Sequence, residues 1–198
     1  NGAVPAMPDA DLRYIPAWLA SGEADAAFEQ LRLAVPWQRH RIRMFGRTVD
    51  SPRLSYWMGD ADAYYRYSGS DFVPQPWLPM LQGWRERLQA DLGQPFNSVL
   101  ANYYRDGADA MGWHSDDEPE LGIEPVIASL SLGATRRFVL KRRSRPELKL
   151  ALALPAGSLL VMAGGTPAHY RHALPRTTRP VGGRINLTFR WVTPRANE

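Results

Sequence analysis

The stretch "VIASLSLG", Val126 to Gly133, is the clearest strand pattern in this sequence. Successive side chains of a strand point to opposite faces, so a period of two separates its residues into two sets. One set holds Ile127 and two serines, Ser129 and Ser131. The other set is wholly apolar: Val126, Ala128, Leu130 and Leu132. The stretch therefore predicts a strand whose two faces differ in chemistry.

Similar short runs surround this strand from about residue 95 onward. They are rich in β-branched and aromatic residues, and Gly and Pro separate them, which is typical of strands joined by turns. The runs are "FNSVLANYY" (96–104), "RRFVLKR" (136–142), "LKLALALPAGSLLVMAG" (148–164) and "RINLTFRWV" (184–192).

Two helices are predicted before these strands. "SGEADAAFEQLRLAV" (21–35) has Ser21 as a candidate N-cap and apolar residues at helical spacing, and Pro36 ends it. "PWLPMLQGWRERLQADLG" (76–93) ends at Gly93, a common helix stop. The apolar stripe of this second helix predicts a core-facing side: Leu78, Leu81, Trp84, Leu88 and Leu92.

Many short strands after two helices favour a sheet sandwich or barrel with helices on one side. The chain has 198 residues, enough for one sizeable core. We therefore predict a single α+β domain over residues 1–198, built on a jelly-roll core. No apolar run approaches the length of a membrane span. Without cysteine there are no disulfides, thiolate metal sites or cysteine nucleophiles, and with no signal-peptide pattern we expect a cytoplasmic protein.

The basic residues are unevenly distributed. The net charge is +4, and 22 of the 24 basic residues are arginine, because lysine occurs only at Lys141 and Lys149. Codon bias in a GC-rich genome would explain this composition. Two clusters favour an anionic partner instead: Arg39, Arg41 and Arg43, which would share one face of a strand, and the segment 136–145. Two basic clusters in one small domain indicate nucleic acid.

A candidate metal site lies in "GWHSDDEPELG", residues 112–122. His114 and Asp116 are two residues apart, so a strand or strand end would aim both at one point. This pair alone is a weak signal and needs a distant third ligand. His172 follows the apolar run "SLLVMAG" by a few residues and is the candidate, with His169 as its rival. Two histidines and one carboxylate are typical of non-haem Fe(II) sites. His40 lies in the first basic cluster and is predicted to be a surface or phosphate-side residue.

The last strand carries two arginines on one face. Arg184 and Arg190 are six residues apart, about 20 Å along a strand. Asn186 and Thr188 share their face, whereas Ile185, Leu187 and Phe189 occupy the other. The polar face would meet either water or a ligand. Guanidinium groups that lean inward would suit a small dicarboxylate.

Five segments together resemble the AlkB family of Fe(II)/2-oxoglutarate-dependent nucleic-acid dealkylation dioxygenases, in the branch of the second and third human homologues. They are "NYYRDGADAMGWHSDDE", "IASLSLGATRRF", "PAGSLLVMAG", "HYRHALP" and "RINLTFR". The resemblance extends from about Tyr14 to Trp191. It implies a double-stranded β-helix with helices on one sheet, a catalytic jelly roll at about 95–193, and a nucleotide-recognition lid at about 40–75.

The resemblance also implies roles for individual residues. The iron ligands would be His114, Asp116 and His172, which decides against His169. Arg184 would bind the distal carboxylate of 2-oxoglutarate and Arg190 would lie nearer the iron-chelating end. The full set of implied 2-oxoglutarate contacts is Asn102, Tyr104, Arg184, Asn186, Thr188 and Arg190.

Residues for the substrate base are implied in the same way. Tyr67 would stack on the extracted base opposite His114, with Tyr65 as the second candidate, although either tyrosine could instead be a core residue. Asp117 and Glu118 resemble residues that contact the base. In "RMFGR", Phe45 would fill the gap left by a flipped base in duplex DNA.

The implied reaction is oxidative demethylation of 1-methyladenine and 3-methylcytosine in DNA. It would use Fe(II), O2 and 2-oxoglutarate and release formaldehyde, succinate and CO2. Two alternatives stay open: the same chemistry on RNA, tRNA or protein, and a binding module with an inactive or zinc-filled site. We expect a monomer that binds nucleic acid and no membrane. The preference between single and double strands is left open.

Overall fold

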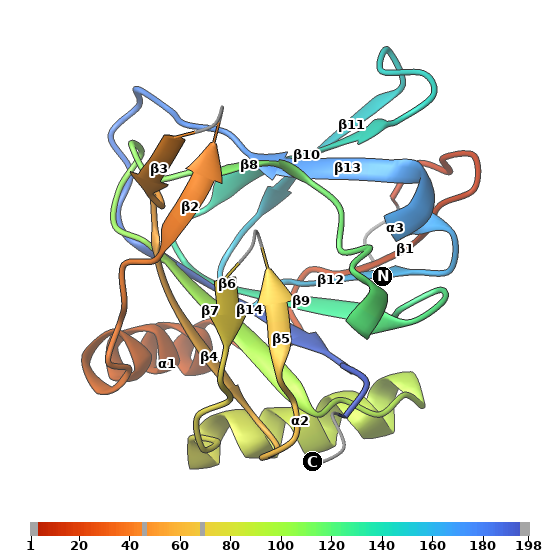
Figure 1. Ribbon diagram of the computed structural model, residues 1–198. Helices are drawn as coiled ribbons and strands as arrows, with labels where there is room; N and C mark the ends of the chain where they lie inside the picture. The colour runs from red at the N-terminus through yellow and green to blue at the C-terminus, as the bar shows by residue number, and fades with distance from the viewer. Residues whose placement is uncertain (1–3, 45–46, 68–69, 195–198) are drawn as a thin grey trace.

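The computed structural model describes residues 4–44, 47–67 and 70–194 and shows two antiparallel sheets that face each other (Figure 1). The six-stranded sheet has the order β1 (Asp11–Ile15), β12 (Leu159–Ala163), β9 (Ile127–Gly133), β14 (Arg184–Arg190), β7 (Ser98–Tyr104), β4 (Leu54–Gly59). The four-stranded sheet has the order β11 (Lys149–Leu154), β10 (Arg136–Arg142), β13 (Tyr170–Leu174), β8 (Met111–His114). This is the predicted jelly roll.

Two helices cover the outer face of the six-stranded sheet, α1 (Ser21–Ala34) and α2 (Pro79–Leu92) (Figure 1). Gly93 ends α2 in the left-handed conformation, with φ 64°, as predicted. The prediction for Ser21 was wrong. The N-cap is Ala20, without a side-chain bond, because the chain is fixed just before it by a hydrogen bond from Leu19 N–H to Gly157 O. Short helical turns, η1 (Pro119–Leu121) and α3 (Thr166–His169), interrupt the strand connections.

Alternation along the central strands creates two separate apolar layers. On β14, Ile185, Leu187 and Phe189 pack with the helices, and the four polar residues point between the sheets. On β9, the predicted apolar face also packs with the helices, whereas Ile127 lies in the second cluster, between the sheets. All seven residues of β14 are buried. The polar face of this strand therefore faces an interior space and not solvent.

The range predicted for a lid, 40–75, is interrupted by a core strand. β4 pairs with β7 along its whole length, and it places Met58 in the helix layer and Trp57 in the layer between the sheets. Two hairpins lie outside the large sheets: β2 (Arg41–Met44) with β3 (Arg47–Asp50), and β5 (Tyr65–Tyr67) with β6 (Ser70–Phe72). The jelly roll likewise begins before residue 95, because β1 pairs with β12. Within the described residues no helix is long and apolar enough to cross a membrane.

Candidate functional site

A pocket lies between the two sheets and encloses about 430 Å³ of empty space, part of it continuous with solvent. Side chains from both sheets line it, including β7 and β14 on one side and β8, β10 and β13 on the other. The nine residues predicted as metal ligands and cosubstrate contacts all line this pocket: Asn102, Tyr104, His114, Asp116, His172, Arg184, Asn186, Thr188 and Arg190. The fold therefore brings together residues that are up to 88 positions apart in sequence (190 − 102).

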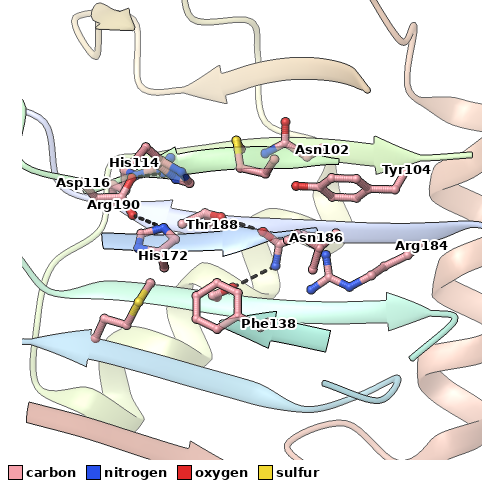
Figure 2. A pocket seen from close by; sticks show the side chains of 14 residues that line it. Asn102, Tyr104, His114, Asp116, Phe138, His172, Arg184, Asn186, Thr188 and Arg190 are labelled. Atoms are coloured by element: carbon pink, nitrogen blue, oxygen red, sulfur yellow. Dashed lines mark hydrogen bonds and ion pairs between the residues drawn. The ribbon is translucent and has the colours of Figure 1, made fainter. Parts of the chain in front are cut away.

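At one end of the pocket, His114, Asp116 and His172 converge (Figure 2). One ligand atom of each lies within 4.8 Å of the other two. His114 and His172 are direct cross-strand partners on β8 and β13, and their ring centroids are 4.1 Å apart. Asp116 Oδ2 is 3.5 Å from His172 Nε2, too far for a hydrogen bond, and has no other partner. His169 is exposed on α3 and outside this group.

The imidazole of His114 is oriented by the backbone of its own strand. Its Nδ1 lies 2.9 Å from the carbonyl oxygen of Gly112. A carbonyl only accepts hydrogen bonds, so Nδ1 carries the proton and Nε2 presents a lone pair. Metal-binding histidines are commonly oriented by such a bond to the second nitrogen.

The electrostatics of the three side chains suit a cation. Burial lowers the pKa of His114, and burial together with His114 lowers the pKa of His172 to about 3. Burial alone would raise the pKa of Asp116, but Arg190 and the two histidines hold that pKa below its usual range. Two neutral imidazoles beside an ionised carboxylate are the protonation states that metal ligands need.

These pKa shifts predict a stability loss in mild acid. His172 titrates near 6.5 when unfolded and near 3 when folded, so between these values only the unfolded chain takes up the proton. The metal-free protein should therefore lose about 2 kcal/mol from this residue between pH 6.5 and pH 5. Asp116, whose pKa is also lowered, adds a further loss below about pH 4.

Urea unfolding with a chelator present, at pH 7 and pH 5, measures this effect. His172→Ala should show a smaller drop between the two pH values than the wild-type chain. Equal drops in both proteins would mean that His172 does not have the lowered pKa.

At the other end of the pocket lies Arg184, which is 2% exposed (Figure 2). Its Nη2 donates to Ser131 Oγ at 2.9 Å, and its Nε is buried without a partner. Among the described residues no carboxylate pairs with it. Burial lowers the pKa of its guanidinium to about 10. A buried cation without a counter-charge is costly, so this end of the pocket is suited to an anion.

Arg190 occupies the metal end of the same strand face. Its Nη2 donates to Asp116 Oδ1 at 2.5 Å, whereas its Nε and Nη1 are buried without partners. Burial lowers the pKa of Arg190, but the Asp116 carboxylate more than offsets this and raises it above the ordinary value. The two arginines thus lie at opposite ends of the pocket, in the order that the sequence analysis predicts (Figure 2).

Asn186 and Thr188 lie between the arginines and bond mainly to the protein. The Asn186 amide nitrogen donates to Ser129 Oγ at 2.8 Å and to Leu130 O at 3.1 Å, and its oxygen accepts from Thr188 Oγ1 at 2.9 Å. Both amide protons are therefore used. In this structure Asn186 fixes the pocket wall and has no donor left for a ligand.

The structure describes the side chain of only one of the three aromatic residues predicted to contact the base. Tyr65 is a core residue: it is 1% exposed, its ring stacks on Trp57 at 4.8 Å, and the Arg190 guanidinium lies 5.7 Å from its centroid. These contacts support the core alternative, and a role of Tyr65 toward the base stays a prediction. The side chain of Tyr67, and all of Phe45, lie outside the described residues, and their roles stay predictions.

The two carboxylates after Asp116 lie in different settings. Asp117 is half-exposed and forms an ion pair with Arg143. Glu118 is partly buried beside Tyr65, and burial together with Asp116 raises the pKa of its carboxyl group. Neither residue is among those that line the pocket.

The second predicted basic cluster lies mostly at the surface, but its first arginine does not. Arg136 is 3% exposed and donates to three carbonyl oxygens, those of Asp106, Asp109 and Pro175. Three other arginines of the segment pair with carboxylates, as Arg142–Asp9, Arg143–Asp117 and Arg145–Glu147, whereas Arg137 is exposed.

The first predicted cluster also differs from expectation. Arg39 precedes β2 and forms an ion pair with Asp50 at 3.5 Å, so it is not on one strand face with its neighbours. His40 is only partly exposed and packs on the ring of Phe72 at 4.6 Å.

Two features were not found from sequence. One is Arg53, buried beside Asn102. The other is a groove of about 1000 Å³ of empty space, solvent included, formed where the β9–β10 and β13–β14 connections meet. We call this the arginine groove; its residues are Thr135, Arg136, Arg137, Pro175, Arg176, Thr177, Arg179 and Val181. The sequence signals for it are the "RTTR" spacing at 176–179 and the start of the basic segment 136–145.

Comparison with known proteins agrees with this geometry. The family model of the 2OG-Fe(II) oxygenase superfamily matches residues 11–190. The chain is 40% identical to the rat (Rattus norvegicus) alpha-ketoglutarate-dependent dioxygenase alkB homolog 3, over 90% of this chain and 63% of the rat protein, so it spans somewhat less than two thirds of that relative. It is 39% identical to the human (Homo sapiens) DNA oxidative demethylase ALKBH2, over 86% of this chain and 69% of the human protein.

A solved structure shares the fold. That of OsALKBH1 superimposes with a TM-score of 0.67 at 17% identity, over 93% of this chain and 99% of that chain. The family match over nearly the whole chain and the identity to ALKBH2 show that this chain belongs to the 2OG-Fe(II) oxygenase superfamily and, within it, to the AlkB homologues.

Proposed function

We propose that this chain is an Fe(II)- and 2-oxoglutarate-dependent demethylase of N-methylated nucleobases in DNA. One observation carries the proposal. A pocket with two histidines and a carboxylate at one end has, at its other end, a buried arginine without a counter-anion among the described residues. A metal with open coordination positions and a dicarboxylate would satisfy both ends at once. The names of the similar rat and human proteins support the same chemistry.

The residues present fit both groups. His114 Nε2, His172 Nε2 and the unpartnered Asp116 Oδ2 would hold Fe(II), and Arg184 would bind the distal carboxylate of 2-oxoglutarate. When bound, Fe(II) with 2-oxoglutarate and O2 supplies the oxidation of an N-methyl group, and the products are formaldehyde, succinate and CO2. This assignment gives the Asp116 oxygen and the Arg184 guanidinium a partner each.

The chain's own residues contribute orientation and charge. Arg190 keeps Asp116 ionised and fixes one of its oxygens by the bond at 2.5 Å. The Gly112 carbonyl fixes the proton on His114 Nδ1. Tyr104, whose ring centroid is 5.5 Å from the Arg184 guanidinium carbon, restricts where that guanidinium can lie. Asp116, Arg190, Arg184 and Tyr104 are buried, which keeps water from competing for their polar groups.

The arginine groove supports a polyanionic substrate. Three of its arginines, Arg137, Arg176 and Arg179, are exposed and have no carboxylate partner among the described residues. The fourth, Arg136, forms its floor and is bonded to carbonyl groups. Guanidinium groups bind phosphate by paired hydrogen bonds, and several in a row follow a nucleic-acid backbone.

Removing the groove charges should weaken nucleic-acid binding in a salt-dependent way. If Arg176 and Arg179 each contact a phosphate, the Arg176→Ala/Arg179→Ala variant should lower the slope of log affinity against log salt by about 0.7 per contact on single strands. Fluorescence anisotropy with an unmethylated oligonucleotide at several salt concentrations measures this. Arg145→Ala is the control, because Arg145 is exposed but paired with Glu147. Equal salt-dependence slopes in the wild-type chain and both variants would show that the groove does not contact the nucleic acid.

The substrate class is tested by mass spectrometry of oligonucleotides that carry one 3-methylcytosine. Single-stranded DNA, duplex DNA and RNA of the same sequence would be incubated with Fe(II), 2-oxoglutarate and O2. We expect loss of the methyl group from DNA. Demethylation of RNA alone would favour the alternative substrate, and no reaction on any of the three, with metal and 2-oxoglutarate bound, would contradict the proposal. We also propose, from the sequence, a cytoplasmic location and a monomeric state.

A further inference from the structure

Arg53, the residue before β4, has no role in the proposal above. It is 5% exposed. Its Nε donates to Asn102 Oδ1 at 3.2 Å, and its Nη1 donates to the carbonyl oxygen of Ala110 at 3.3 Å. Among the described residues no carboxylate pairs with it. This buried guanidinium therefore donates only to two neutral acceptors. One of them belongs to Asn102, which lines the pocket.

The guanidinium is anchored independently of Asn102. The N–H of Ala110 donates to the carbonyl of Pro52 at 2.8 Å, and Arg53 returns a bond to the carbonyl of Ala110. These two bonds clamp the start of β4 onto the residue that precedes β8, the strand that carries His114. Asn102 is thus held by a fixed group and not by a flexible surface side chain.

The bond to Arg53 decides which end of the Asn102 amide faces the pocket. A guanidinium has only donors, so the atom that meets it must be the amide oxygen. The amide nitrogen, with two donor hydrogens, is the end left for a ligand. An anionic ligand is stabilised by a hydrogen-bond donor and repelled by an acceptor. If the Asn102 amide were flipped by 180°, its oxygen would face the pocket and weaken binding of the anion. Asn186, whose amide is already used, cannot replace this donor.

We propose that Arg53 is a positioning residue that holds the amide nitrogen of Asn102 toward the pocket and thereby sets the affinity for 2-oxoglutarate. This inference rests on the proposed function, because it takes 2-oxoglutarate as the pocket's ligand. It assigns Arg53 no contact with the ligand itself. On this inference its effect on 2-oxoglutarate binding passes through Asn102, while its charge, after the larger effect of burial, also lowers the pKa of His114.

A double-mutant cycle tests the inference. Arg53→Met keeps the length of the side chain and removes its donors. The dissociation constant for 2-oxoglutarate would be measured without O2, with Mn(II) in place of Fe(II), for the wild-type chain, Arg53→Met, Asn102→Ala and the double variant. We expect each single variant to weaken binding by about tenfold or more. The double variant should bind no more weakly than Asn102→Ala, because Arg53 has nothing left to position.

Two further variants separate positioning from structural support. Arg53→Lys retains a donor and a charge and should recover part of the affinity. Arg85→Met is the matched control, since Arg85 on α2 pairs with Asp60 and neither residue lines the pocket, and it should leave 2-oxoglutarate binding unchanged. Mn(II) affinity and the unfolding midpoint, measured on every variant, identify any variant that fails to fold. If Arg53→Met fails to fold, Arg53→Lys takes its place in the cycle.

The outcomes are distinguishable. Losses that add in the double variant would show that Arg53 supports the fold and does not act through Asn102, which overturns the inference. Unchanged binding in Arg53→Met, or in Asn102→Ala, would also overturn it while leaving the pocket's ligand intact. A wild-type chain that does not bind 2-oxoglutarate at all would instead contradict the proposed function, and the inference with it.

Discussion

His172→Ala is expected to lose turnover by more than about 100-fold while the protein stays folded. The expectation follows from the environment of His172, which is buried, neutral and opposite His114 on the neighbouring strand. Substitution of groups that only orient metal ligands already costs 10–100-fold, so loss of a ligand should cost more. Metal content by mass spectrometry and formaldehyde release measure the two consequences.

Asp116→Asn extends this test. The amide keeps the shape of Asp116 and its oxygen can still accept from Arg190, so the buried guanidinium retains a partner. It removes the negative charge that a metal needs, so the same loss of turnover is expected. His169→Ala is the matched control, because His169 is exposed on α3 and outside the group of three. Wild-type turnover in His172→Ala at micromolar iron would show that His172 is not a metal ligand.

Arg184→Met should weaken 2-oxoglutarate binding by about 30-fold or more. Truncating one partner of a desolvated charge pair typically costs about 2–5 kcal/mol. The same substitution should not destabilise the ligand-free protein, because it removes a buried charge that has no counter-charge among the described residues. Kinetics at varied 2-oxoglutarate and urea unfolding of the ligand-free chain give the two measurements.

This combination of effects is specific to a ligand-binding arginine. A structural arginine would lower the stability and leave the cosubstrate dependence unchanged. Arg85→Met serves as the control with a paired guanidinium. An unchanged KM for 2-oxoglutarate in Arg184→Met would place the anion elsewhere in the pocket.

Much of the site could be predicted because it depends on local periodicity. A period of two places Arg184 and Arg190 on one face of β14, and the same period aims His114 and its neighbour Asp116 at one side. The apolar set on that strand, opposite the arginines, could also be assigned to the core. What periodicity could not give was the cross-strand register that sets His172 directly opposite His114, because it is fixed by pairing across 58 residues (172 − 114).

The errors share one physical origin, long-range contacts to the backbone or to another sheet. Arg136 looks like a surface charge in "RRFVLKR", yet its acceptors are carbonyl groups of two loops that are distant in the chain. The sequence could not show whether Tyr65 on β5 points inward, because only the packing of its ring on Trp57 decides this. β4 was missed because both of its faces are buried, so it does not alternate.

The most direct test of the account is equilibrium binding of 2-oxoglutarate to the full chain without O2, with and without Fe(II). If the His114–Asp116–His172 group and Arg184 form one centre, calorimetry should find one 2-oxoglutarate per chain in the presence of Fe(II). Binding should weaken sharply when the metal is removed or when Arg184 is replaced by methionine. Binding that is indifferent to both changes, or no binding at all with Fe(II) present, would contradict the account.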